Sequence, residues 1–315
     1  MAIEKTKFSI IIPVYNAADI IRNTLDSIRS QSYKNYEVLV TNDGSTDDTE
    51  KTLEKYKREY SQFPLYYVTQ KNAGVSAARN NSISRASGDY AAFLDQDDLW
   101  LSEKLNEVYK AIKENSGANV FYHEAIAIGW KRKVNFFKYG ALKEPYYLDL
   151  LFNFNRIGIS TAAVKMNILK SVGGFDENYK YSEDYDLWLK LARSGEIFHY
   201  IPFFLSKYIW RPESMSNQVD NMTGEKIKIF EKNCSYLFEE GKYGRQYLNS
   251  KYKRAKSRIF FGSSRRLYFL GDYKKALDYC FLAIKTDKKF WKPYLGLILL
   301  YLKFKISFLH CTRKS

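Results

Sequence analysis

The sequence has few of the residues that build disulfide frameworks and structural zinc sites. Its 315 residues include only three cysteines (Cys234, Cys280, Cys311) and three histidines (His123, His199, His310). The cysteines are far apart and odd in number, so neither a disulfide framework nor a Cys/His zinc site can be assembled from them. This composition favours a reducing compartment, and we expect a cytoplasmic location.

Long apolar runs are also missing. The first run, Phe8–Tyr15, has eight residues and contains a proline, which makes it too short and too interrupted for a signal peptide. The ten residues from Pro293 to Leu302 are apolar before Lys303 interrupts them, whereas about 20 are needed to span a bilayer. We therefore expect no secretion signal and no membrane-spanning helix, although the late run is suited to lying on a membrane surface.

Acidic residues are scarce in only one part of the chain. Residues 1–220 contain 28 basic and 28 acidic side chains, whereas residues 221–315 contain 22 basic and seven acidic ones. The whole net charge of +15 therefore lies in residues 221–315. We expect a neutral region, residues 1–220, and a basic region, residues 221–315, suited to a polyanion or an anionic membrane face.

What the first hundred residues do contain is a regular alternation of β-branched runs and amphipathic stretches. Helical periodicity begins near Asp19, Asp47 and Val75. The runs between these stretches predict four strands, Ser9–Val14, Glu37–Asn42, Leu65–Thr69 and Tyr90–Asp95. This alternation is typical of βαβ units, so we expect an α/β fold with a largely parallel sheet covered on both faces.

The second half of the chain changes character. Two further strands are predicted over residues 118–128 and 159–165, followed by a helix from Ser182 to about Ser194. After Met222 the strand signals vanish and only helices are predicted, including a pair joined at Gly271-Asp272. That pair is similar to a tetratricopeptide hairpin, but one copy is too little for a solenoid.

The motif FLDQDDLW, residues 93–100, follows the fourth predicted strand. In an extended chain residues i and i+2 point to the same face, so Asp95 and Asp97 can converge while Gln96 turns away. Two carboxylates at the carboxyl end of a parallel strand suit a hard cation such as Mg²⁺ or Mn²⁺. The alternative is that Asp97 and Asp98 only cap a helix beginning near Leu101.

Two more motifs lie where predicted strands meet helices. In VTNDGSTDDT, residues 40–49, Asp43 can accept a hydrogen bond from the imide N–H of a uracil, or the segment is a turn in which Ser45 and Thr46 cap the next helix. In KNAGVSAARN, residues 71–80, Arg79 can reach a diphosphate, or it is simply a solvated arginine.

The fourth motif is KYSEDYDLWLKLARSG, residues 180–195. It places Glu183 and Asp184 in the first turn of a predicted helix. Acidic residues there compensate the helix dipole, which is one sufficient explanation. The other is that one of these carboxylates acts as a general base toward an incoming hydroxyl group.

Together these motifs, in this order, resemble family 2 inverting glycosyltransferases with the GT-A fold. The resemblance covers about Phe8–Ser216 and includes SIIIPVYN, NDGSTDDT, NAGVSAARN, DQD, GGFDE and the ED pair. It implies a GT-A domain over residues 1–220, with a Rossmann-like, mostly parallel sheet flanked by helices. An all-helical region would follow over residues 221–315.

The resemblance also implies roles for individual residues, beginning with the donor. The residues expected to bind the nucleotide sugar are Pro13, Tyr15, Asp43, Arg79, Asp95, Gln96 and Arg211. Among them Tyr15 would stack on uracil, Asp43 would bond its N–H, and Asp95 would contact the ribose. Asp97 would ligate the Mg²⁺ or Mn²⁺ ion that bridges the diphosphate.

On the acceptor side, Asp184 would be the catalytic base, with Glu183 and Trp188 beside the acceptor. One departure from the family concerns an Arg-x-His spacing near the end of the domain. Here Ile209 and Arg211 occupy those positions. We therefore expect Arg211 to contact the diphosphate directly and Asp97 to remain the main protein ligand of the metal.

The activity implied is that of a metal-dependent hexosyltransferase. It would transfer a sugar from a UDP-sugar, with inversion, to a hydroxyl of a glycan, in particular a lipid-linked one, during polysaccharide biosynthesis. The alternative is a catalytically inactive nucleotide-sugar or glycan-binding module that scaffolds a membrane assembly. A nucleotidyltransferase would need a glycine-rich basic loop after the first strand, where this chain has VYNAADI.

The basic region interleaves lysine and arginine with tyrosine, phenylalanine and tryptophan. Such helices can attach to an anionic membrane, and we expect a peripheral position on the cytoplasmic face of the inner membrane. The alternative is an ordinary helical subdomain with solvated lysines. No nucleic-acid-binding motif is present, so no nucleic acid partner is expected, and the sequence leaves the oligomeric state open.

Overall fold

The computed structural model describes residues 6–129, 133–211 and 214–311, without the side chains of 216 and 302–311. The chain divides into two compact units. One contains Met1–Leu150 and Asn155–Arg211, and the other contains Leu151–Phe154 and Pro212–Ser315.

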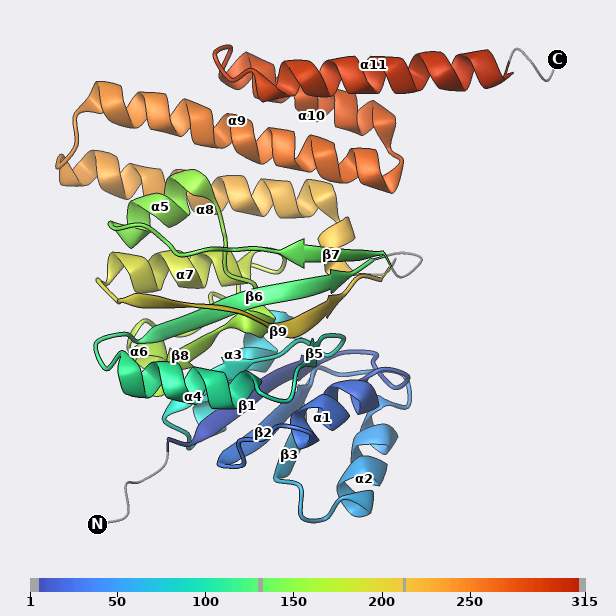
Figure 1. Cartoon of the computed structure of the whole chain (residues 1–315), viewed down its shortest axis with the longest axis vertical. Coiled ribbons are helices and arrows are strands. Elements are labelled where there is room, and N and C mark those ends of the chain that lie inside the picture. Colours follow the sequence, from blue (N-terminus) through green and yellow to red (C-terminus); the bar gives the residue numbers. More distant parts are fainter. Residues whose placement is uncertain (1–5, 130–132, 212–213, 312–315) are drawn as a thin grey trace. The chain divides into compact units, whose positions relative to one another are not determined.

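The described part of the first unit is built on a nine-stranded sheet (Figure 1). Its order is β3-β2-β1-β4-β8-β6-β9-β5, and β7 pairs with β6 outside this path. The first four strands are mutually parallel: β1 (Phe8–Val14), β2 (Tyr36–Asn42), β3 (Leu65–Thr69) and β4 (Tyr90–Phe93). The four strands predicted for the first hundred residues are thus confirmed, although the last ends two residues early.

Helices cover both faces of this parallel half. They are α1 (Ile21–Arg29), α2 (Thr49–Glu59) and α3 (Val75–Arg85). Ile10 and Ile12 of β1 pack in one core with Leu25 of α1, whereas α3 contacts β1 and β2 directly. Burial on two faces explains why β1 and β2 are nearly continuous apolar runs.

The rest of the sheet is mixed. Strands β4 and β8, β6 and β8, and β5 and β9 are antiparallel, while β6 and β9 are parallel. The expected largely parallel sheet is therefore parallel mainly in its first half. The remaining elements are β5 (Leu99–Trp100), α4 (Lys104–Glu114), β6 (Val120–Ile128), β7 (Val134–Phe137), α5 (Tyr146–Asn153), a 3₁₀ turn (Ile159–Thr161), β8 (Ala163–Lys165), α6 (Met166–Ser171), α7 (Glu183–Arg193) and β9 (Phe198–Ile209).

The second unit is helical, as expected. After a 3₁₀ turn (Met215–Asn217), four described helices follow one another, α8 (Val219–Glu240), α9 (Arg245–Leu270), α10 (Tyr273–Thr286) and α11 (Lys292–Cys311). The predicted junction at Gly271-Asp272 is present: Gly271 has φ 87°, and the Asp272 side chain accepts a hydrogen bond from the N–H of Lys275 at 3.1 Å. None of the helices in the described ranges has the length and apolarity that crossing a bilayer would take.

His123, in β6, is a buried histidine whose environment disfavours its charged form. His123 has no exposed surface, and its Nδ1 lies 2.8 Å from the carbonyl oxygen of Glu124. Within the described residues its Nε2 has no hydrogen-bond partner. Burial, together with the nearby charge of Lys104, lowers the pKa of His123 from 6.5 to about 3.

We therefore expect acid to destabilise the protein through His123. Its pKa is lowered in the folded state, so the unfolded chain takes up a proton below pH 6.5 that the folded chain does not. The contribution of His123 to the free energy of unfolding is fully present above pH 6.5 and is lost as the pH falls toward 3. At pH 5 the loss is about 2 kcal/mol. Urea unfolding of the wild type and of His123→Gln, at pH 5 and at a pH above 6.5, measures this loss apart from the other groups that titrate in that range. A His123→Gln variant with the same acid sensitivity as the wild type would contradict the assignment.

Candidate active site

The loops after β1 and β2 are tied together at the carboxyl edge of the sheet. The N–H of Asn16 donates to Ser45 Oγ at 2.9 Å, and the N–H of Thr46 donates to Asn16 Oδ1 at 2.8 Å. Ser45 and Thr46 therefore do not cap α2, which begins at Thr49 with Asp48 as its N-cap. The capping interpretation is wrong because these two side chains lie too far before the helix and serve the neighbouring loop.

Tyr15 and Gln96 meet at the same edge, where β1 and β4 end. The N–H of Tyr15 donates to Gln96 Oε1 at 2.7 Å, and Gln96 Nε2 donates to the carbonyl of Tyr15 at 3.1 Å. The Gln96 amide thus fixes the backbone of Tyr15, whose side chain is 45% exposed. Pro13 is buried within β1 opposite Thr41, so it shapes this segment from inside the sheet.

Asp43 is 4% exposed and holds the loop that leads into α3. Its Oδ1 accepts from Gln70 Nε2 at 2.8 Å and from the N–H of Ala73 at 2.9 Å, and its Oδ2 accepts from the N–H of Gly74 at 2.8 Å. The adjacent Gly44 has φ 71°, and a Cβ there would lie 2.8 Å from the backbone N of Asn72. The structure gives Asp43 a positioning role, and the uracil contact stays a prediction.

Arg79 joins two motifs that are far apart in the sequence. Its guanidinium is buried on α3, with one terminal nitrogen 2.7 Å from Asp95 Oδ1 and the other 2.6 Å from Glu183 Oε1. The guanidinium also lies 5.1 Å from the ring centroid of Phe175. The solvated-arginine interpretation is wrong, because the guanidinium is buried and both ends of its fork bind carboxylates.

The acidic triplet divides into three environments. The side chain of Asp95 is one-third exposed, and its N–H donates to Ser160 Oγ at 3.1 Å. Burial and the charge of Asp95 raise the pKa of Asp97 to about 6, while Arg211 opposes that rise. Asp98 is buried and accepts from the N–H of Ile209 at 3.2 Å. None of the three caps α4, which begins at Lys104 after Glu103.

The first turn of α7 completes the group. Asp184 is partly exposed, its Oδ2 accepts from Asn155 Nδ2 at 2.8 Å, and its Oδ1 accepts from the N–H of Tyr185 at 2.6 Å. Glu183 is 9% exposed and bound to Arg79. Burial raises the pKa of Glu183 to about 7, with Arg79 opposing and Asp184 adding to the rise. Asp184 is therefore the oriented carboxylate nearer to solvent.

Trp188, which we expected beside the acceptor, is buried in the core. Its side chain has no exposed surface, and its indole N–H donates to the carbonyl of Ile157 at 3.1 Å. Its ring packs 6.4 Å from that of Phe93. Trp188 anchors α7 in the core and does not face an acceptor in this structure, because the apolar stripe of the helix points inward.

Three residues that the motifs did not mark also lie here. Asn155 and Ser160 bind Asp184 and the backbone of Asp95, as described above. Tyr139 is the third: burial and the charges of Asp98 and Asp184 raise the pKa of its hydroxyl. A Cβ on Gly158 would lie 2.6 Å from that hydroxyl, so the glycine makes room for it. No spacing in the sequence links these residues to the motifs.

The donor set suits a divalent cation only in part. Among the described residues no group of three or more His, Cys, Asp or Glu side chains could hold a metal ion. The charge of Asp95, however, acts on Asp97, and the positive charge of Arg211 offsets it only in part. A single carboxylate together with phosphate oxygens and water is a usual environment for Mg²⁺, so the residues fit an ion that arrives with a diphosphate.

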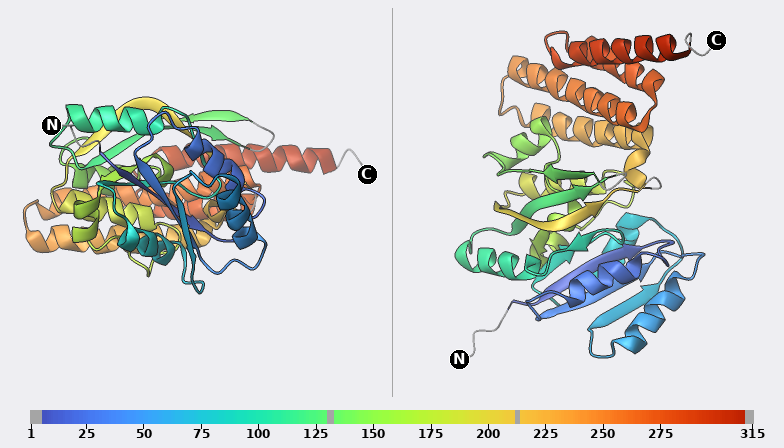
Figure 2. Two further views of the ribbon diagram at one scale, coloured as in Figure 1. Left: turned by 90° about the horizontal axis from the view of Figure 1, so that it is seen from below. Right: turned by 45° about the vertical axis from the view of Figure 1, so that its right-hand side comes forward.

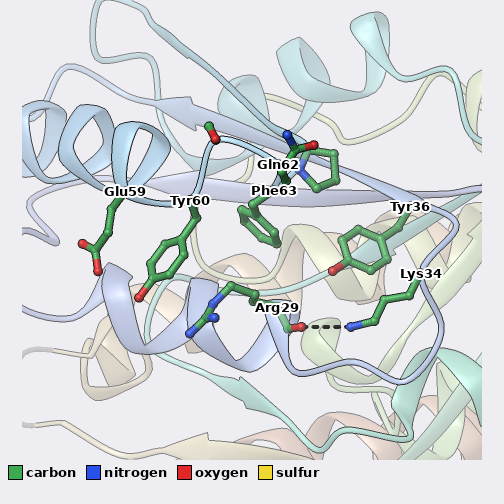
Figure 3. A pocket seen from close by; sticks show the side chains of 9 residues that line it. Arg29, Lys34, Tyr36, Glu59, Tyr60, Gln62 and Phe63 are labelled. Atoms are coloured by element: carbon green, nitrogen blue, oxygen red, sulfur yellow. Dashed lines mark hydrogen bonds between the residues drawn. The ribbon is translucent and has the colours of Figure 1, made fainter.

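A cavity of about 490 Å³ lies elsewhere in the first unit (Figure 3). Its walls include Arg29, Tyr36 and Tyr60, and the Arg29 guanidinium lies 4.1 Å from the ring centroid of Tyr60. Lys34 Nζ donates to the carbonyl of Arg29 at 3.2 Å, which the figure marks. Tyr36 and Pro64 stand at the amino ends of β2 and β3. This cavity is therefore at the opposite edge of the sheet from the motifs.

Comparison with known proteins identifies the family of the chain. Residues 9–171 match the family described as Glycosyl transferase family 2. The amylovoran biosynthesis glycosyltransferase AmsB of Erwinia amylovora is 32% identical over 212 residues, covering 64% of this chain and 69% of AmsB. The first curated relatives are matched over only 60%, 19% and 60% of their own lengths.

Two solved structures share the fold. S. aureus TarS 1-349, in complex with UDP-GlcNAc, aligns with TM-score 0.66 and 19% identity, covering 89% of this chain and 81% of TarS 1-349. The mannosyltransferase PcManGT of Pyrobaculum calidifontis, in complex with GDP-Man and Mn²⁺, aligns with TM-score 0.60 and 18% identity, covering 97% and 81%. The expected GT-A fold with a helical region after it is confirmed.

Proposed function

This chain belongs to glycosyl transferase family 2, and from that membership we propose that it transfers a sugar from a nucleoside diphosphate donor to a glycan hydroxyl. The observation that carries the proposal is the buried Arg79, bound to Asp95 at 2.7 Å and to Glu183 at 2.6 Å. It holds the acidic motif after β4 beside the first turn of α7. The groups that we propose to bind the donor thus lie near the proposed base.

The donor we propose is a UDP-sugar. The half-exposed ring of Tyr15, whose backbone Gln96 fixes, would stack on the uracil. Asp43 keeps the loop before α3 in position, and Asp95 would accept from the ribose hydroxyls. TarS, with the same fold, was solved with UDP-GlcNAc, whereas PcManGT was solved with GDP-Man. The identity of the nucleobase in the donor is therefore the first point to test.

Asp97 would hold the Mg²⁺ or Mn²⁺ ion, with Arg211 beside it on the diphosphate. Such an ion neutralises the charge that develops on the departing nucleoside diphosphate. Arg211 acts on the pKa of Asp97 through its charge, which supports its place near the same phosphates. Its planar fork is suited to binding two phosphate oxygens at once.

Asp184 would act as the general base. It is the partly exposed carboxylate of the pair, and Asn155 and the N–H of Tyr185 orient its two oxygens. It would take the proton of the acceptor hydroxyl while that oxygen attacks the anomeric carbon opposite the leaving diphosphate. A single displacement of this kind inverts the configuration without a sugar–enzyme bond.

We extend the proposal to polysaccharide biosynthesis with a lipid-linked glycan acceptor, on the cytoplasmic face of a membrane. The supporting relative is AmsB, which is named for amylovoran biosynthesis. Residues 1–220 would carry the catalysis, and residues 221–315 would serve docking. The competing function is an inactive module that binds nucleotide sugars or glycans in a membrane assembly.

A donor panel tests the proposed function. We expect one UDP-sugar to release UDP in the presence of Mn²⁺ and an acceptor glycan, and GDP-mannose to release no GDP, because Tyr15 and Asp43 frame a uracil. Coupled detection of the released diphosphate measures both. Tight UDP binding without turnover across donors and acceptors would favour the inactive module, and release from GDP-mannose alone would overturn the uracil assignment.

A further inference from the structure

Helix α11 has an exposed apolar face. Four residues of the helix, Tyr294, Leu295, Ile298 and Leu299, and Trp291 directly before it are between 41% and 60% exposed. Their spacing is i, i+3, i+4, i+7 and i+8, which on a helix places them along one side. Large apolar side chains that form a contiguous exposed patch on a protein surface mark an interaction site.

The opposite side of α11 is already committed to the core of the second unit. Leu300 is 2% exposed and belongs to a cluster with Leu267, Ala276 and Cys280. At Gly296 a Cβ would lie 2.8 Å from the ring of Phe261, which shows how closely the helix packs there. In the stack of helices α11 is the outermost layer (Figure 2). Its orientation is therefore fixed with the apolar face outward.

The sequence from Lys288 onward carries charge of one sign. From Lys288 to the end of the sequence there are seven basic residues and no acidic one. Lys288, Lys289 and Lys292 are exposed, and in the ranges that the structure describes they form no ion pair. A face of aromatic and aliphatic side chains beside unpaired lysines is complementary to lipid with anionic headgroups.

We propose that the exposed apolar face of α11 docks on an anionic lipid surface. Trp291 and Tyr294 would lie at headgroup level, Leu295, Ile298 and Leu299 would enter the acyl boundary, and the lysines would meet acidic headgroups. A second copy of the chain fits the face less well, because a two-fold pairing would bring the exposed Lys288, Lys289 and Lys292 of both copies together. The site adds to the proposed function and does not depend on which sugar is transferred.

The test is sedimentation of the full chain with vesicles of phosphatidylglycerol and phosphatidylcholine, compared with phosphatidylcholine alone. We expect binding to the anionic vesicles that weakens at high salt. The double variant Ile298→Ser/Leu299→Ser should lower the partition constant by about tenfold or more. Each of Lys288→Gln, Lys289→Gln and Lys292→Gln should lower it about fivefold.

The matched control is Tyr66→Ser/Ile197→Ser, which removes two side chains of similar exposure (52% and 46%) from the first unit. It should bind vesicles like the wild type. The proposal is overturned if Ile298→Ser/Leu299→Ser binds vesicles as the wild type does. It is also overturned if the wild type is a dimer that this double variant dissociates, since that points to a second copy. UDP release with a soluble acceptor should be equal in both, so a failure here leaves the proposed transferase activity standing.

Discussion

Asp184→Asn is expected to lower the rate of sugar transfer by about 10²- to 10⁴-fold, the usual contribution of a general base. The amide keeps the size of the carboxylate and can still meet Asn155 after a rotation, but it cannot take the acceptor proton. Asp184 is partly exposed, so the substitution leaves no buried charge unpaired. The fold should therefore survive, and UDP should bind as tightly as to the wild type.

Two measurements separate this loss from misfolding or from lost donor binding. Titration calorimetry with UDP should give the same dissociation constant for both proteins, while kcat for transfer falls. Asp48→Asn is a suitable control, because that carboxylate is 70% exposed and pairs with Lys51 at the surface. Equal kcat values for Asp184→Asn and the wild type would show that Asp184 is not the general base, and Glu183 would then be the next candidate.

The parallel half of the fold could be predicted because each of its strands is buried on both faces. That burial requires the continuous apolar runs seen in β1 and β2, and such runs are visible without any partner. The second half offers no such signal. β5 has two residues, β8 has three, and β9 contains Pro202 and alternates irregularly between buried and exposed positions. These strands are held in place by their neighbours rather than by their own sequence.

The candidate site was predictable to the extent that its motifs follow strands. Residues after parallel strands meet at one edge, so Tyr15, Asp43 and Asp95 had to be neighbours. The partners of Arg79 could not be read in this way, because Glu183 is 104 positions away and the pairing depends on how α7 packs. Trp188 was misassigned although Leu187 and Leu191 beside it already indicated a core-facing stripe.

Arg79→Met is expected to be strongly destabilising, by about 3–5 kcal/mol, the usual cost of removing one partner of a buried ion pair. The methionine fills similar space but leaves Glu183, which is 9% exposed, without its counter-charge. Urea unfolding measures the loss. Arg22→Met is the matched control: its guanidinium also lies 2.6 Å from a glutamate, Glu59, but both side chains are nearly two-fifths exposed. Its effect should be small because water screens that pair.

The pair Arg79–Glu183 can be separated from a general packing effect by adding Glu183→Gln to Arg79→Met. Most of the cost of Arg79→Met lies in the carboxylate left behind, so the double variant should be more stable than Arg79→Met alone. Burial already raises the pKa of Glu183 to about 7, and without Arg79 it should rise further. A raised pKa stabilises the folded state below it, so Arg79→Met should gain stability relative to the double variant as the pH falls through that higher pKa toward 4.5, the ordinary value for a glutamate. The contrary result is the same free energy of unfolding for Arg79→Met and the double variant at every pH. In that case Arg79 acts through its volume and not through its charge, and the contact between the acidic motif and α7 is steric.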